Sequence, residues 1–336
     1  MKLEDFTYTL PKDKIATHPP KVRGEAKLLV LNRETGTIED RDYANLIDYL
    51  EPGDVLVLND TKVLPARLIV RDADKQPVEL LILEKHASGD FHQVLYRGKL
   101  NIGDILSLDG HQIKVTEVLE GGIAEVEADT DLLELAYTYG DVPLPPYIKR
   151  DATPEDIERY QTTFARQVGS VAAPTASLNL TPALLGLIKA KGVDIRYLTL
   201  HVGLGTFLPI RVETIENHKM NAEYFEIPAE TVEAIQRSKR AIAVGTTVCR
   251  TLEYAADQIK NYNRSKSITG EADIFIYPGY TFQIVDGLVT NYHAPKSTVL
   301  MLAAAFAGWG NLIKAYEHAL TSDYRFLSYG DSMLII

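Results

Sequence analysis

The sequence changes character twice along its length, and this change constrains the fold more than any other feature. Between residues 68 and 141, short runs of alternating apolar and polar residues are separated by turn pairs such as Gly103-Asp104 and Asp109-Gly110. Five strands are predicted there, over residues 78–84, 91–96, 104–108, 112–118 and 122–127. Strands that follow one another through tight turns, with no helix between them, indicate a small antiparallel barrel.

Both flanks of this segment alternate strands with helices instead. Strands are predicted over residues 27–31, 54–58, 193–200, 241–244 and 273–277, and helices over 43–50, 182–191, 228–240, 248–260 and 297–307. This alternation predicts an α/β main domain with a mixed sheet. We expect residues 1–67 and 148–336 to form it, with a β-barrel domain inserted at 68–147 and a stiff, proline-rich linker at 143–150.

Composition places the chain among folded proteins of a reducing compartment. Its 46% hydrophobic and 24% charged residues exclude disorder as the main state. Cys249 is the only cysteine, which excludes a disulfide framework and a thiolate-rich metal site. Glu4 and Asp5 stand where a signal peptide would be apolar, and the apolar run 299–307 is too short to span a bilayer. We expect a cytoplasmic monomer without a membrane contact.

The net charge argues against nucleic-acid binding through the overall field of the protein. Thirty-five basic residues against 46 acidic ones give a charge of −11. A local basic face is compatible with that balance, and its candidates are Lys12, Lys14, Lys21 and Arg23. The alternative, that these are ordinary solvated surface cations, remains open.

Neither a bound cofactor nor a metal is predicted. The segment 202–206 has two glycines but lacks the third glycine of a dinucleotide-binding loop, and no phosphate-binding Gly-Lys-Ser/Thr follows it. The histidines are scattered, and only His218 and Glu223 lie close together, without a third ligand at metal-site spacing.

Polar residues gather where the predicted strands end. They are Asn59, Asp60 and Thr61, then His201, then Thr246 and Arg250, and then Pro278, Gly279 and Tyr280; Asn291 and His293 stand just before the predicted apolar helix at 297–307. In open α/β sheets, ligands bind beyond the carboxyl ends of the strands, so these segments are expected to meet in one pocket. The alternative for each segment taken singly is a capping turn, because the same residue types favour turns.

Ten segments, in order along the chain, carry a resemblance to a known family. They are NDTKVLPARL (59–68), PLPPYIKR (143–150), YQT (160–162), GSVAAPTA (169–176), TLHVG (199–203), AVGTT (243–247), IYPG (276–279), VD (285–286), TN (290–291) and SYGD (328–331). The chain resembles the S-adenosylmethionine:tRNA ribosyltransferase-isomerase family of queuosine biosynthesis. The resemblance covers nearly the whole chain and implies an α/β domain with an inserted barrel.

The resemblance implies a particular reaction. In this family, the ribosyl part of S-adenosylmethionine is transferred and isomerised onto 7-aminomethyl-7-deazaguanine at the tRNA wobble position. Adenine and methionine leave, and the product is epoxyqueuosine-tRNA. S-adenosylmethionine is a co-substrate, no further cofactor or metal is implied, and the expected partner is tRNA. The chemistry needs a base beside the sulfonium, an acid for adenine departure, and polar groups that hold the ribose.

The resemblance also implies roles for individual residues. Candidates for proton transfer are Asp60, His201 and His293. Candidates for substrate binding are Asn59, Thr61, Arg67, Tyr160, Pro174, Thr175, Gly203, Gly205, Thr206, Thr246, Arg250, Pro278, Gly279, Tyr280, Asp286, Asn291 and Asp331. For Asp286 and Asp331, capping of a turn is an equal alternative.

Four positions depart from the family pattern. Ser177, Asn179, Leu204 and Asn221 replace smaller residues or histidines, in motifs expected to line the pocket. One alternative is therefore a divergent S-adenosylmethionine-using relative with another amine or RNA substrate. A second is a non-catalytic RNA-binding relative, against which the retained Asp60, His201, Arg250 and His293 argue.

Overall fold

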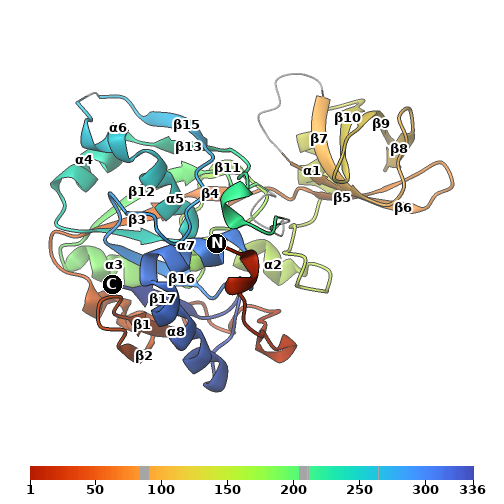
Figure 1. The fold of residues 1–336 in the computed structure, drawn as a ribbon. Coiled ribbons are helices and arrows are strands. Elements are labelled where there is room, and N and C mark those ends of the chain that lie inside the picture. The colour runs from red at the N-terminus through yellow and green to blue at the C-terminus, as the bar shows by residue number, and fades with distance from the viewer. Residues whose placement is uncertain (84–90, 204–209, 211, 264) are drawn as a thin grey trace.

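A sheet of strands occupies the middle of the larger part of the molecule (Figure 1). The structure, a computed structural model, describes residues 1–83, 91–203, 210, 212–263 and 265–336. Its main sheet has nine strands, which are, in order across it, β15 (Ile268–Ala272), β13 (Glu223–Ile227), β12 (Asp194–Leu200), β3 (Val55–Asn59), β14 (Ala241–Val244), β16 (Gly287–Asn291), β17 (Ser332–Ile335), β1 (Lys27–Leu31) and β2 (Ile38–Asp42). The central strands β12, β3, β14 and β16 are parallel, so their carboxyl ends share one edge.

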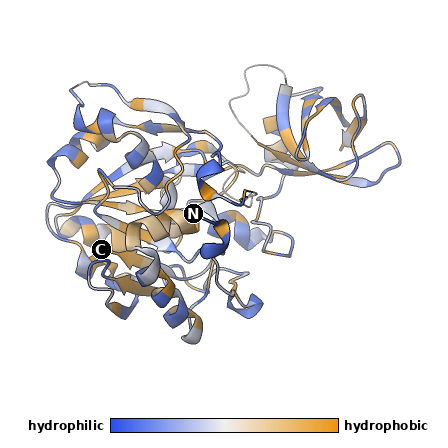
Figure 2. Ribbon diagram, in the orientation of Figure 1, coloured by the Kyte–Doolittle hydropathy of each residue, from blue (hydrophilic) through white to orange (hydrophobic). Residues whose placement is uncertain are grey.

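Both faces of this sheet are buried. In β3, Val55 and Val57 pack on one face and Leu56 and Leu58 on the other. The first face is covered by α4 (Ala229–Arg237), α5 (Thr246–Tyr254), α7 (Thr298–Ala307) and α8 (Trp309–Thr321), and the second by η3 (Tyr43–Tyr49) and α3 (Pro182–Ala190). Burial on two faces explains why the central strands β3 and β14 are continuous apolar runs rather than alternating ones (Figure 2).

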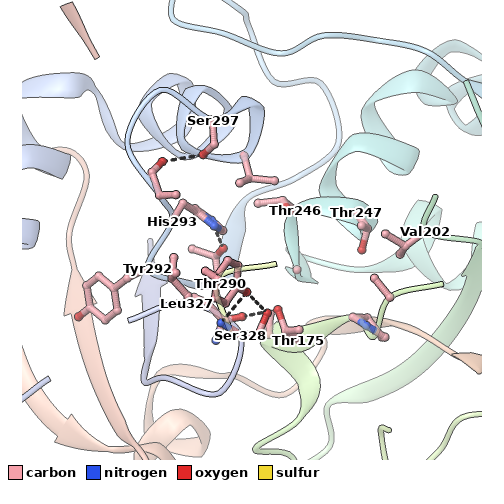
Figure 3. Close-up of a pocket in the computed structure, with 18 of the residues that line it drawn as sticks. Thr175, Val202, Thr246, Thr247, Thr290, Tyr292, His293, Ser297, Leu327 and Ser328 are labelled. Atoms are coloured by element: carbon pink, nitrogen blue, oxygen red, sulfur yellow. Dashed lines mark hydrogen bonds between the residues drawn. The ribbon is translucent and has the colours of Figure 1, made fainter. Parts of the chain in front are cut away.

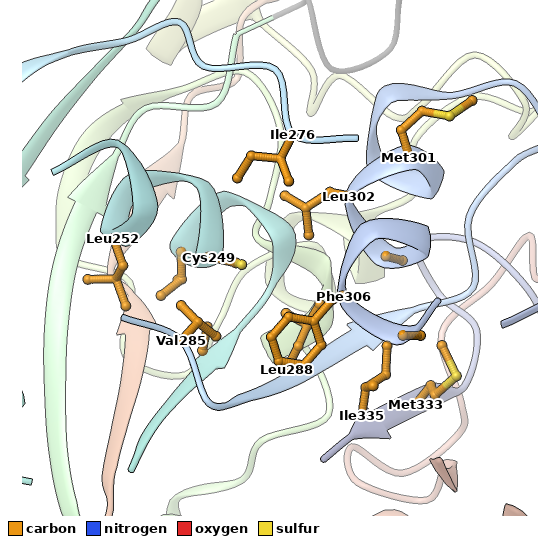
Figure 4. Packing of buried hydrophobic residues seen from close by; sticks show 14 of the residues in the cluster. Cys249, Leu252, Ile276, Val285, Leu288, Met301, Leu302, Phe306, Met333 and Ile335 are labelled. Carbon is orange, nitrogen blue, oxygen red and sulfur yellow. The ribbon is translucent and has the colours of Figure 1, made fainter. Parts of the chain in front are cut away.

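The core between α5, α7 and the sheet is well filled. Figure 4 shows Cys249 of α5 and Leu302 and Phe306 of α7 above Leu288 of β16. Ile276 reaches the same core from a segment that pairs with none of the strands that the structure describes. The predicted strand at 273–277 is therefore wrong, because β16 takes the place beside β14, and the edge of the sheet is formed by β15.

The alternating segment forms a closed antiparallel barrel beside the main domain (Figure 1). Its strands are, in order around it, β10 (Ile123–Ala128), β7 (Phe91–Arg97), β6 (Pro77–Ile82), β5 (Arg67–Arg71), β8 (Ile105–Leu108) and β9 (His111–Val118). The five predicted strands are present, and β5 is a sixth, with Leu68 and Val70 facing the barrel core. Helix α1 (Leu132–Tyr139), also not predicted, packs Leu132 and Leu135 against that core.

The predicted fold class is thus confirmed, while the domain boundaries at 67/68 and 147/148 stay predictions. The predicted helix at 43–50 is the 3₁₀ helix η3, and the predicted helix at 248–260 is divided into α5 and α6. The remaining elements are η1 (Leu3–Asp5), η2 (Lys12–Lys14), β4 (Thr61–Val63), α2 (Pro154–Arg159), β11 (Gln167–Ser170), η4 (Thr175–Ser177), η6 (Ile215–Asn217) and α6 (Ala256–Lys260). Strands β4 and β11 pair in parallel as a separate small sheet.

In the described part of the chain, no single helix is long and apolar enough to cross a membrane. The pair α7 and α8 meets the length and composition criteria only when taken together, and it is bent by 112°. Most of α7 is buried in the core of the main domain.

A buried carboxylate fastens the chain where it returns from the barrel. Asp156 accepts two hydrogen bonds from the Arg150 guanidinium, at 2.6 and 2.8 Å, and one from the Tyr329 hydroxyl at 2.6 Å. It also accepts from the backbone N–H of Thr153, at 2.7 Å. Burial acts to raise the pKa of Asp156, but these hydrogen bonds outweigh it and hold the pKa well below its usual range.

We expect Asp156→Asn to lower the free energy of unfolding by ~3 kcal/mol at pH 7, because it leaves Arg150 without its charge partner. Tyr329→Phe, the matched control, removes one hydrogen bond and should cost about 1 kcal/mol. Since the unfolded carboxyl takes up a proton near pH 4 and the folded one does not, the wild-type advantage should shrink as the pH falls below about 4. Urea denaturation from pH 7 to 3.5 measures this. Equal stability of wild type and Asp156→Asn at pH 7 would contradict the assignment.

Candidate functional site

A cavity of about 630 Å³ lies beyond the carboxyl ends of β14 and β16 (Figure 3). Its walls come from segments far apart in the sequence: residues 172–176, 245–247 and 290–297, with Tyr147, Leu327 and Ser328 closing one side. This is the edge at which open α/β sheets bind ligands. Two of the predicted polar segments, 245–247 and 290–293, therefore meet at one cavity.

Local backbone geometry brings the start of α5 to this cavity. Gly245, between β14 and α5, has a φ of 103°, a conformation that favours glycine. The turn places Thr246 and Thr247 in the cavity wall. The N-terminal end of a helix, with its free backbone N–H groups, therefore faces the space where a ligand would bind.

Hydroxyl and amide groups make a polar floor on an otherwise apolar cavity. The Thr175 hydroxyl donates to Oδ1 of Asn291 at 2.9 Å, and Nδ2 of Asn291 donates to the carbonyl of Asp331 at 3.4 Å. Thr290 Oγ1 and His293 Nε2 are hydrogen-bonded at 2.8 Å. These neutral groups suit ribose hydroxyls better than they suit a charged group.

His293 is held from behind by two tyrosines. The Tyr8 hydroxyl donates to its carbonyl, and its backbone N–H donates to the Tyr316 hydroxyl at 2.9 Å. Burial lowers the pKa of the His293 imidazole to about 3. The ring is therefore neutral at physiological pH and serves as a hydrogen-bonding group.

Three consecutive residues, starting with the last residue of β3, each bind one of three consecutive residues around the end of β12. Asn59 bonds the backbone N–H and carbonyl of Leu200, at 3.1 and 3.0 Å. Asp60 accepts from the Thr199 hydroxyl at 2.7 Å. Thr61 Oγ1 is hydrogen-bonded to His201 Nδ1 at 2.9 Å. The carboxyl ends of the two strands are thereby locked together.

The His201 side chain is fixed on three sides. Besides its bond to Thr61, it stacks on Tyr224, with ring centroids 5.9 Å apart and planes at 22°. A Cβ atom on Gly169 would lie 2.7 Å from the imidazole, so only glycine leaves room for the ring. His201 does not line the described cavity, but its neighbour Val202 does.

Asp60 also forms an ion pair, with Arg166, at 2.9 Å. Its side chain is buried, whereas that of Arg166 is exposed. Together with the bond from Thr199, this pairing occupies both carboxylate oxygens. The contacts suit a group that positions the end of β12.

The structure divides the other predicted site residues into three groups. Pro174, Thr175, Thr246, Asn291 and His293 line the cavity. Gly205 and Thr206, with Leu204, lie outside the described residues. The remaining predicted residues are described but do not line it; they are Asn59, Asp60, Thr61, Arg67, Tyr160, His201, Gly203, Arg250, Pro278, Gly279, Tyr280, Asp286 and Asp331.

Several members of the last group form internal contacts. Asp286 accepts from the backbone N–H of Ala241 at 2.8 Å, and Asp331 accepts from those of Lys27 and Arg325, both at 2.7 Å. Asp286 and one oxygen of Asp331 thus bind backbone N–H groups of segments distant in the chain, and only the bond from Arg325 closes a local turn.

Other predicted residues lie in the surroundings of the cavity. Arg250 is buried against Glu223, and burial lowers its pKa to about 10, so it stays a cation. The Tyr280 hydroxyl donates to Glu253 at 3.1 Å. Arg67 lies in a second hollow, of about 550 Å³, beside the barrel, and pairs with Glu79 at 3.0 Å.

The positions that depart from the family pattern do not form the cavity wall. Ser177 and Asn179 are buried and Asn221 is exposed, and none of the three lines the described cavity. Of the motif 176–180 that contains two of these positions, Ala176 lines the cavity. The first two residues of η4, Thr175 and Ala176, meet the cavity, whereas its last residue, Ser177, does not.

The predicted basic face is only partly available. Arg23 donates to the backbone carbonyls of Gln161, Leu178 and Glu158, at 2.9, 3.0 and 3.1 Å. Lys14 donates to the carbonyl of Ser322. Lys12 and Lys21 are exposed.

Sequence reasoning missed several cavity residues, namely Tyr147, Thr247, Thr290, Lys296, Ser297 and Ser328. Most lie within or beside the recognised segments, so adjacency was the available signal. Lys296 and Ser297 line the cavity because the segment 292–297, which connects β16 to α7, forms part of its wall. The sequence alone carries no signal for this path. Among the described residues, no three His, Cys, Asp or Glu side chains are grouped to hold a metal ion.

The fold and the cavity define an α/β protein of the open-sheet class, with a ligand cavity at the carboxyl edge and a barrel inserted in the chain. Residues 3–335 match the profile of the family described as queuosine biosynthesis protein. The S-adenosylmethionine:tRNA ribosyltransferase-isomerase of Chlorobaculum parvum is 54% identical over 100% of both chains, and that of Francisella tularensis subsp. mediasiatica is 44% identical over the same share. The chain belongs to the S-adenosylmethionine:tRNA ribosyltransferase-isomerase family.

A solved structure agrees with this assignment. The crystal structure of the S-adenosylmethionine tRNA ribosyltransferase from Thermotoga maritima is 34% identical in sequence, with a TM-score of 0.56. The match covers 99% of this chain and 100% of that one.

We expect the His293 imidazole to remain neutral from pH 8 down to 5, because its burial disfavours the charged form. Its ring ¹⁵N shifts should be constant over this range, with the signal assigned by its loss in His293→Gln. In urea the same ring should titrate near pH 6.5. The unfolded state then binds a proton that the folded state excludes, so this group lowers stability as the pH falls from about 6.5 toward 3. Titration of the folded ring between pH 5 and 8 would contradict the assignment.

Proposed function

We propose that this chain transfers and isomerises the ribosyl group of S-adenosylmethionine onto 7-aminomethyl-7-deazaguanine at the tRNA wobble position. The products are epoxyqueuosine-tRNA, adenine and methionine. The observation that carries the proposal is the full-length match to the ribosyltransferase-isomerases, together with a cavity at the carboxyl edge of the sheet. S-adenosylmethionine is the co-substrate, and the RNA is the second substrate.

The cavity has the size and lining that such a co-substrate needs. Its volume of about 630 Å³ lies in the range of small-molecule sites. The hydroxyls of Thr175, Thr246 and Thr290 and the amide of Asn291 line it, and they supply hydrogen bonds for a ribose whose ring must open. The surrounding alanine, proline and leucine side chains exclude water from the reacting centre.

For proton transfer we propose His201, with Asp60 and His293 as positioning groups. The imidazole of His201 is held by Thr61, Tyr224 and Gly169 in one orientation, as a general base requires. Asp60 orients the end of β12 through Thr199. His293, with its lowered pKa, offers a neutral ring to the polar floor.

For the RNA, we propose a contact through the exposed Lys12 and Lys21. Arg23 and Lys14, engaged with backbone carbonyls, hold the first part of the chain in place. A net charge of −11 makes such a local face necessary, because the overall field repels phosphates.

We expect the protein to release adenine and methionine from S-adenosylmethionine only with an anticodon stem-loop that bears 7-aminomethyl-7-deazaguanine. The RNA should gain the mass of the epoxide-bearing ribosyl group, because its amine is the nucleophile that the reaction requires. Liquid chromatography with mass spectrometry measures both products, and the matched control is the same stem-loop with guanine. Methyl transfer to the RNA, or RNA binding without any mass gain, would overturn the proposal.

We expect His201→Ala to lower the turnover rate by about 10²- to 10⁴-fold, the usual effect of losing a general acid or base. Affinity for S-adenosylmethionine should change much less than turnover, because a general base acts in the chemical step rather than in ground-state binding. Gly169→Ala keeps the imidazole but displaces it, since the new Cβ would lie 2.7 Å from the ring, so it should also slow turnover. Single-turnover rates measure both effects. A loss below tenfold in His201→Ala would remove His201 from the mechanism.

A further inference from the structure

Lys296 stands out among the residues of the large cavity because of its charge. Of the lining residues that the structure describes, it alone carries a full charge at neutral pH. The other titratable members are Tyr147, Tyr292 and His293: burial raises the pKa of both tyrosines, and it lowers that of the histidine to about 3. A single fixed cation in an apolar, hydroxyl-lined cavity selects where an anionic group of a ligand lies.

The position of Lys296 supports an anion-binding role. It directly precedes Ser297, the N-cap of the ten-residue helix α7, and Ser297 and Val299 line the same cavity. The Ser297 hydroxyl accepts from the N–H of Leu300, while the N–H groups of Thr298 and Val299, the first two residues of α7, have no partner within the helix. Cationic side chain and helix N-terminus therefore attract an anion to the same end of the cavity.

The present partner of Lys296 is easily displaced. Its ammonium group pairs with Glu4 at 2.7 Å, and the Glu4 side chain is 74% exposed. Exposed ion pairs of this kind contribute little free energy. The backbone of Lys296 is held independently, because its N–H donates to the carbonyl of Phe6 at 3.1 Å. The lysine can thus change partner without movement of the chain.

We infer that Lys296 binds the α-carboxylate of the methionyl group of S-adenosylmethionine, at the end of the cavity formed by the start of α7. This inference rests on the proposed function, which supplies the ligand. S-adenosylmethionine carries one carboxylate, beside an ammonium and a sulfonium, so the carboxylate is the group that a cation attracts. The methionyl arm then lies toward α7, and the ribose lies over Thr175, Thr290 and Asn291.

The test is a cycle of two ligands and two proteins, measured by calorimetry. The ligands are S-adenosylmethionine and decarboxylated S-adenosylmethionine, and the proteins are wild type and Lys296→Met. A stem-loop with guanine at the wobble position is present at saturation, so that no turnover occurs. The wild type should bind the decarboxylated ligand roughly 10- to 100-fold more weakly, as expected for loss of a charged hydrogen bond. Lys296→Met should bind both ligands weakly and about equally.

Two further variants separate charge from structure. Lys296→Arg keeps the cation and should preserve the preference for the carboxylate. Glu4→Gln breaks the surface ion pair but keeps the lysine, so it should preserve the preference as well. If Lys296→Met does not fold, the wild type and Lys296→Arg with the two ligands still decide the question.

The two proposals fail in different ways. Failure of the wild type to release adenine with the modified stem-loop would overturn the proposed function, and the inference with it. If adenine is released, but the wild type binds both ligands equally, the inference alone is overturned. The same holds if Lys296→Met retains the full preference for the carboxylated ligand.

Discussion

The hydrogen bonds between the ends of β3 and β12 are the interaction on which the rest of the site depends. Asn59, Asp60 and Thr61 bind Leu200, Thr199 and His201 in turn, all within a buried part of the sheet edge. A buried amide or carboxylate without partners would cost free energy, so this edge is stable only when all three bonds form together. These hydrogen bonds fix the orientation of His201 and the direction in which the chain continues from β3 toward the barrel.

The cavity forms where the same edge passes into helices. Gly245 turns the chain from β14 into α5, and His293 lies in the segment that connects β16 to α7. Threonine hydroxyls, a neutral imidazole and one lysine give this space a graded polarity: hydrogen-bonding groups on the floor and a cation at one end. A co-substrate with a ribose in the middle and a carboxylate at one end is complementary to that gradient.

Because the barrel is inserted in the chain, the segment that follows it has to be held against the main domain. Asp156, Arg150 and Tyr329 make this connection through a buried, fully hydrogen-bonded ion pair. Such an ion pair stabilises the fold only when both side chains are correctly placed, because a misplaced partner leaves an uncompensated charge in the interior. Segments from the middle and the end of the sequence are thereby held together beside Tyr147 and Ser328, which line the cavity.

The sequence by itself determined the architecture. Strands buried on two faces are continuous apolar runs, whereas barrel strands alternate apolar and polar residues, and this hydrophobic pattern can be read from the local sequence. It also indicated Thr175, Thr246, Asn291 and His293 as cavity residues. Only the tertiary structure decided that β16, rather than residues 273–277, pairs with β14, since pairing depends on competition between segments distant in the chain. It likewise showed that Asp286 and Asp331 bind backbone N–H groups of distant segments, and that Lys296 lines the cavity. The sequence gives the chemical groups that each side chain carries, but the neighbours with which those groups interact are set by the tertiary structure.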